Sequence, residues 1–85
     1  PNPFNASTVI RYRIPWESHV RLIVYDILGN ELQVIVNEVQ RSGYKSIMWD
    51  AVLMPSGIYF YRLSASSIAD NTEYFDEVRK LLLVK

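Results

Sequence analysis

Short stretches in which apolar and polar residues alternate recur along this chain, and turn-forming residues separate them. Within residues 8–14, apolar side chains occupy every second position from Ile10 to Ile14, and Pro15 ends the stretch. A period of two predicts a strand with one buried and one exposed face. Similar stretches predict further strands at 19–27, 31–36, 44–49, 58–65 and within 72–84. Six or seven strands at this spacing favour an all-β fold, an immunoglobulin-like β-sandwich of about seven short antiparallel strands.

Residues 19–36 are predicted to form a hairpin, because two alternating stretches flank a turn. Gly29 and Asn30 both tolerate a positive φ angle, which such turns require. The carboxylate of Asp26 is expected to accept backbone N–H groups of the turn. Asp26 and Gly29 are therefore predicted to be structural turn residues, and Asp50 is expected to play the same part in a later loop.

Two segments lack this alternation. Residues 37–43 are polar and are predicted to be a loop. Leu81-Leu82-Leu83-Val84 is a continuous apolar run, which is typical of a strand buried on both faces or of a helix end. A strand is favoured, because the run is short and every other segment is β.

The two sheets are predicted to enclose one core. Its expected members are Leu22, Val24, Trp49, Tyr59 and Leu63. Tyr59 follows Gly57-Ile58, so its hydroxyl could bond to upstream backbone as a tyrosine corner, or the ring could be an ordinary core aromatic. Trp16, just past a proline, either caps one end of the sandwich or contacts a partner or a sugar.

The composition narrows the classes of function. The length of 85 residues predicts a single domain over 1–85, and a first residue of Pro1 suggests a piece of a longer protein. A formal net charge of zero argues against binding to nucleic acid or to an acidic membrane surface. The chain has no cysteine, so neither a disulfide nor a thiolate metal site is expected. No apolar run is long enough to span a bilayer.

Few residues could support a reaction. His19 is the single histidine, and its neighbour Ser18 would point to the opposite face of a strand, so no catalytic triad and no usual zinc set is expected. We therefore expect no enzyme activity and no cofactor. The carboxylates near the last turn are either a solvated loop or a weak calcium site; they are Asp70, Glu73, Asp76 and Glu77.

Two further patterns have ordinary structural explanations. Asn5-Ala6-Ser7 is formally a glycosylation sequon, but such short matches are common, and these side chains can bond to local backbone. Four arginines could line one face, although basic residues on the solvent face of a strand need no ligand; they are Arg11, Arg13, Arg21 and Arg41.

Four spaced segments together resemble the type A C-terminal sorting domain of the type IX secretion system. They are Pro1-Asn2-Pro3-Phe4-Asn5, Val24-Tyr25-Asp26-Ile27-Leu28-Gly29, Ser56-Gly57-Ile58-Tyr59-Phe60-Tyr61 and Lys80-Leu81-Leu82-Leu83-Val84-Lys85. The resemblance covers nearly the whole chain and implies an immunoglobulin-like fold. It also implies a non-catalytic signal that directs a parent protein through the periplasm to the cell surface or exterior.

The resemblance further implies partners. An outer-membrane translocon would recognise the domain, a sortase-like protease would often remove it, and a catalytic or binding domain would precede it in the parent protein. The residues expected to take part in recognition are Gly57, Tyr59, Lys80, Leu82, Val84 and Lys85.

Two other classes of function stay open at this point. The opening Pro1-Asn2-Pro3-Phe4-Asn5 also resembles immunoglobulin-like domains related to the flagellar hook-capping protein. The chain could accordingly be an accessory or spacer module of a secreted enzyme, one that binds carbohydrate or packs on the catalytic domain. A small enzyme is the third class, and the missing nucleophile–base pair argues against it.

Overall fold

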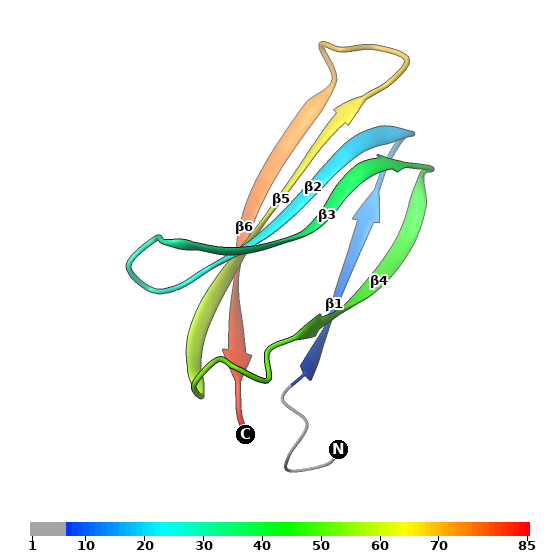
Figure 1. The fold of residues 1–85 in the computed structure, drawn as a ribbon. Helices are drawn as coiled ribbons and strands as arrows, with labels where there is room; N and C mark the ends of the chain where they lie inside the picture. The colour runs from blue at the N-terminus through cyan, green and yellow to red at the C-terminus, as the bar shows by residue number, and fades with distance from the viewer. Residues whose placement is uncertain (1–6) are drawn as a thin grey trace.

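A computed structural model describes residues 7–85, and all of its regular elements in that range are strands (Figure 1). The six strands are β1 (Ser7–Ile14), β2 (Ser18–Tyr25), β3 (Glu31–Gln40), β4 (Gly43–Asp50), β5 (Gly57–Ser67) and β6 (Tyr74–Leu83). The predicted all-β, immunoglobulin-like class is confirmed, with six strands in the described range where about seven were expected. None of the described residues forms a helix that could cross a membrane.

The strands form two antiparallel sheets of unequal size. The smaller sheet pairs β1 with β4, and the larger sheet has the order β3-β2-β5-β6. Figure 1 shows β1 and β4 side by side, apart from the four-stranded layer. β6 is at the edge of the larger sheet, and on its inner face Arg79 is exposed while Leu81 and Leu83 are buried.

The predicted hairpin over 19–36 is present as β2 and β3, but β3 is longer than expected. The prediction of a loop from residue 37 was wrong for residues 37–40, which continue the ladder and pair with β2. These polar side chains suit an edge strand, where one side of the backbone faces water. Backbone pairing rather than apolar alternation therefore sets the end of β3.

The core lies between the two sheets and includes all five residues predicted for it. Leu22, Val24, Trp49 and Leu63 are at most 1% exposed, and Tyr59 is 5% exposed. The Trp49 and Tyr59 rings meet edge to face, with centroids 5.1 Å apart. The indole N–H of Trp49 donates to Gln33 Oε1 at 3.0 Å, so this buried donor is satisfied.

The short connection between β1 and β2 covers one end of the sandwich. Trp16 is partly buried against the core and lies 6.0 Å from the ring of Phe75 on β6. The buried Ser18 hydroxyl donates to the Trp16 carbonyl at 2.6 Å and fixes the bend. Trp16 therefore caps this end, as one of its two predicted roles requires.

The apolar run at the end of β6 alternates in its surroundings. Leu81 and Leu83 are 7% and 2% exposed, whereas Leu82 is 66% exposed and Val84 is 74% exposed. The prediction of a strand buried on both faces was wrong. The larger sheet is covered on one side only, so alternate side chains of this edge strand point to the core and to water.

Candidate recognition surface

Three of the segments that carry the resemblance meet at one end of the sandwich. Asp26 and Ile27 of the β2–β3 turn and residues 55–59 at the start of β5 line a shared hollow of about 440 Å³. The end of β6 lies against the same part of β5, since Leu82 pairs with Ile58 and Leu83 with Gly57. The fourth segment, Pro1-Asn2-Pro3-Phe4-Asn5, lies outside the described residues.

The β2–β3 turn is organised by the carboxylate of Asp26. Its Oδ1 accepts the backbone N–H groups of Leu28 and Asn30, each at 2.9 Å, and its Oδ2 accepts the Asn30 side-chain amide at 3.0 Å. The Asn30 amide first, and then these backbone N–H groups, hold the pKa of Asp26 below its ordinary value. Gly29 has a φ of 85°, while Asn30 does not adopt a positive φ.

Asp50 plays a similar part at the end of β4. Its Oδ1 accepts the backbone N–H of Val52 at 3.2 Å, as the sequence predicted. The next residues form the β4–β5 loop, which borders the hollow. The Asp26 carboxylate thus orders the β2–β3 turn, and the Asp50 carboxylate orders the start of the β4–β5 loop.

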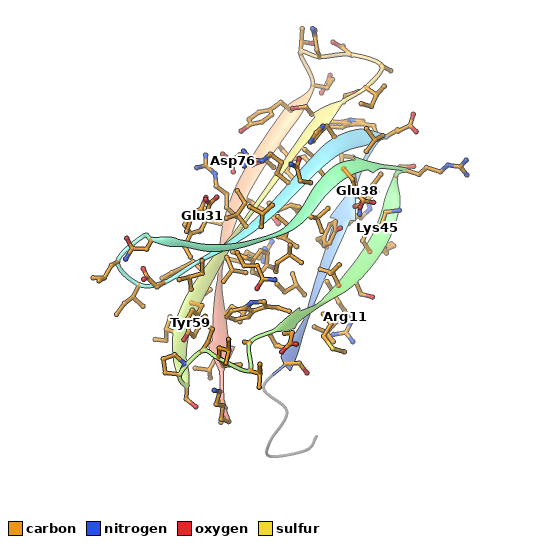
Figure 2. The ribbon with its side chains drawn as sticks, in the orientation of Figure 1. Arg11, Glu31, Glu38, Lys45, Tyr59 and Asp76 are labelled. Carbon is orange, nitrogen blue, oxygen red and sulfur yellow. The ribbon has the colours of Figure 1, made fainter. Side chains whose placement is uncertain are left out.

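Tyr59 holds the β4–β5 loop from the inside. Its side chain is buried at the lower end of the sandwich in Figure 2, and its hydroxyl donates to the Pro55 carbonyl at 2.6 Å. This bond to backbone four residues upstream is the contact that the tyrosine-corner hypothesis expected. Because Tyr59 is only 5% exposed, its side chain positions the loop and is not available to a partner.

The last residues of the chain are tied to the same loop. The backbone N–H of Lys85 donates to Ser56 Oγ at 3.1 Å, and its ammonium group donates to the Val52 carbonyl at 2.9 Å. The side chain of Lys80 is exposed and lies on the same face of β6 as Leu82. The two lysines that were expected to take part in recognition therefore differ, since one is tethered to the loop.

An exposed apolar surface results from this convergence, and we call it the end patch. Its members are Ile27, Ile58, Leu82 and Val84. They are 68%, 43%, 66% and 74% exposed, respectively. Contiguous exposed apolar side chains commonly mark sites of interaction with other proteins. Sequence reasoning named Leu82 and Val84 but missed Ile27 and Ile58, although both stand inside the segments that carry the resemblance.

Among residues 7–85, no nucleophile is hydrogen-bonded to His19. The imidazole is exposed, and its Nε2 lies 2.6 Å from Asn37 Oδ1. The adjacent Ser18 is buried on the opposite face, where its hydroxyl donates a hydrogen bond to the Trp16 carbonyl. His19 therefore belongs to the polar outer surface of the larger sheet.

The carboxylates near the last turn are engaged separately. Asp76 forms an ion pair with Arg62, and this guanidinium is the main reason why the pKa of Asp76 is lowered. Asp70 accepts the backbone N–H and the hydroxyl of Thr72, and the hydroxyl contact is the larger cause of its own lowered pKa. Within residues 7–85, no three His, Cys, Asp or Glu side chains are grouped to hold a metal ion.

Comparison with known protein families identifies the family to which the chain belongs. The family model of the secretion system C-terminal sorting domain matches residues 1–74. This chain belongs to that family. The matched range includes the Asp26 turn and the start of β5, and it ends before Lys80. No curated protein and no solved structure matches the chain.

The function follows from membership of the family. The domain is a C-terminal sorting signal for type IX secretion, and it implies export to the cell surface or exterior. Sorting domains of this family are not catalytic, and they interact with the type IX secretion machinery.

Proposed function

We propose that this sorting domain is recognised by the outer-membrane translocon through the end patch, and that a sortase-like protease then removes it from the protein to which it is joined. In this proposal the chain acts as a folded sorting signal and catalyses no reaction. The single observation that carries the proposal is the exposure of Leu82 and Val84 beside two segments of the family pattern.

The physical argument rests on the cost of leaving apolar side chains in water. Burying a Leu or Val side chain on association contributes about 1.5–3 kcal/mol, so two such residues can anchor a partner. The adjacent Lys80 adds a positive charge at the rim of the end patch, where it can favour an acidic partner surface and speed association. The buried Leu81 and Leu83 hold the same strand in place.

The decisive experiment changes the end patch without touching the core. A reporter protein joined to this domain would carry Leu82→Ser and Val84→Ser together. We expect the folded reporter to accumulate in the periplasm, with the thermal midpoint of the isolated domain unchanged, because both side chains are exposed. The matched control is Val34→Ser with Val39→Ser on β3, at positions 43% and 52% exposed.

Normal export of the end-patch variant would contradict the proposed surface. A second pair of variants separates the effect of charge from that of apolar contact. Lys80→Ala with Lys85→Ala removes two exposed charges, whereas deletion of residues 80–85 also removes the buried Leu81 and Leu83. Export lost only on deletion assigns the lysines no direct part in recognition. Normal export of the deleted protein would show that this segment has no role in sorting.

A further inference from the structure

The outer face of the smaller sheet contains a second hollow, which none of the three described segments that carry the resemblance lines. Its volume is about 540 Å³, within the range of small-molecule sites. The residues that line it are Arg11, Tyr12, Arg13, Tyr44, Lys45 and Ser46. Arg11 and Lys45 are seen on this sheet in Figure 2.

The register of β1 and β4 explains the hollow. Ile10 and Ile14 are buried toward the core, so Arg11 and Arg13 stand on the outer face of β1. Arg13 pairs with Tyr44 and Arg11 pairs with Ser46. A small serine thus stands among three long side chains and leaves space above the sheet.

The outer face of this sheet has a positive excess, although the whole chain is formally neutral. Arg11 and Arg13 stand on that face with a single acid, Asp50, at the far end of β4, whereas Lys45 pairs with the buried Tyr12 and borders the hollow from the inner side. The two ion pairs found among residues 7–85 are Arg62–Asp76 and Arg79–Glu77. Both arginines of the hollow are therefore free, in the described part of the chain, to bind an anion from outside.

Tyr44 adds a flat aromatic surface to these charges. It is 86% exposed, and the Arg13 guanidinium carbon lies 5.9 Å from its ring centroid. A contact of this kind orients the guanidinium beside the ring. An exposed tyrosine ring offers an apolar surface for the C–H face of a sugar and a hydroxyl for its polar rim.

We propose that this hollow binds an anionic sugar. The carboxylate or phosphate oxygens accept hydrogen bonds from Arg11 and Arg13, whose planar forks match both anions. The Ser46 hydroxyl contacts a sugar hydroxyl, and the ring of the sugar packs on Tyr44. This site is separate from the end patch, so sugar binding and export are independent properties of the domain.

A hollow on the larger sheet is a poorer candidate and provides the matched control. It measures about 310 Å³, and Arg21 and Arg62 are among its lining residues. The Arg62 guanidinium is already bound by the Asp76 carboxylate, so an incoming anion would have to compete with it. Arg21 is an exposed arginine on the outer face of the larger sheet, and Arg21→Gln controls for loss of one surface charge.

The test is calorimetric titration of the 85-residue chain with three sugars: an oligogalacturonate, glucose 6-phosphate and a neutral galacto-oligosaccharide. We expect at least one of the anionic sugars to bind and the neutral one not to bind, and the choice between the two identifies the anion. Arg11→Gln with Arg13→Gln should weaken the affinity at least about tenfold, the usual effect of losing hydrogen bonds to a charged group. Tyr44→Ala should also weaken it, and Arg21→Gln should leave it unchanged.

Three results would overturn the proposal: no binding of either anionic sugar, equal binding of the neutral sugar, or affinity unaffected by the changes at Arg11 and Arg13. Titration with a polyglutamate peptide separates a sugar site from an acidic-peptide site. Equal affinity for polyglutamate, unaffected by Tyr44→Ala, would assign the hollow to an acidic protein segment instead. Thermal midpoints confirm that each variant is folded, and these exposed positions are expected to change them little.

Discussion

The two faces of the last strand use similar residues for different purposes. On the inner face, Leu81 and Leu83 are buried in the core that also contains the packed rings of Trp49 and Tyr59. On the outer face, Leu82 and Val84 stand in water. Chemistry alone does not distinguish the two sets, since three of the four side chains are leucine.

The difference shows how a small domain can combine stability with recognition. The inner set contributes to folding and has no surface left for a partner. The outer set contributes little to folding, because its exposure changes little when the chain unfolds, and that leaves its apolar area for association. The recognition proposed for the outer set therefore requires the folded domain, because the buried Leu81 and Leu83 fix the strand that presents it.

The strongest way to break the inner face is to remove its largest side chain. Trp49→Ala should lower the free energy of unfolding by about 3–5 kcal/mol, because the indole is buried and packs edge to face on Tyr59. Domains of this kind have only about 5–15 kcal/mol in total, so the variant should be close to unfolding at growth temperature. Urea unfolding followed by circular dichroism measures the loss, and an unchanged midpoint would show that Trp49 is not in the core.

The comparison itself is tested by neighbouring leucines. Leu83→Ala should cost about 2–5 kcal/mol, because it leaves a cavity in the core. Leu82→Ala, one residue away and 66% exposed, should change stability by no more than about 0.5 kcal/mol. Matched urea titrations of the two variants give both numbers. Equal losses would mean that the two faces of β6 are not distinct.

Much of this arrangement could be read from the sequence, because alternation reports burial directly where one face of a strand is polar. Residues 8–14 and 19–25 are of this kind, and the core residues Leu22 and Val24 lie in the second of these stretches. The turn at Asp26 was predictable because Gly29 permits a positive φ and the Asp26 carboxylate can accept backbone N–H groups of the turn.

The remaining features depend on tertiary arrangement. In the run Leu81-Leu82-Leu83-Val84 no polar residue marks the outer face, so the exposed side chains are decided by the tertiary arrangement, in which the smaller sheet covers only one face of the larger sheet. The sequence left open whether the four arginines share one face, and the structure separates them, with Arg11 and Arg13 on the smaller sheet and Arg21 on the larger. Local periodicity does not predict which strands pair in the same sheet.

A smaller effect tests how the inner face positions the outer one. Tyr59→Phe keeps the ring against Trp49 and removes only the hydroxyl that donates to the Pro55 carbonyl. We expect a loss of about 1 kcal/mol, the usual net value of one hydrogen bond. Amide exchange should also become faster in the β4–β5 loop, around Val52 and Ser56, while the rest of β5 stays protected. Unchanged exchange in that loop would show that the corner does not hold it.

The smallest expected effect concerns the turn that presents Ile27 to the end patch. Hydrogen bonds from Asn30 first, and then from the turn's backbone, lower the pKa of Asp26 in the folded domain, whereas an aspartate in an unfolded chain has a pKa of about 3.9. The unfolded state therefore binds the proton more readily. The carboxylate's contribution to stability is fully present above the unfolded pKa and is lost as the pH falls through the folded pKa.

Asp70 and Asp76 also have lowered pKa values, so the intact domain should lose stability in acid through all three carboxylates. Asp26→Asn keeps the shape of the side chain and removes one titrating group. Compared with the wild type, its urea midpoint should be slightly lower at neutral pH, and the gap should close as the pH falls below about 4. A gap that is constant over this range would show that the charge of Asp26 does not stabilise the turn. Such a result would mean that Gly29 and the hairpin backbone, and not the Asp26 carboxylate, position Ile27 in the end patch.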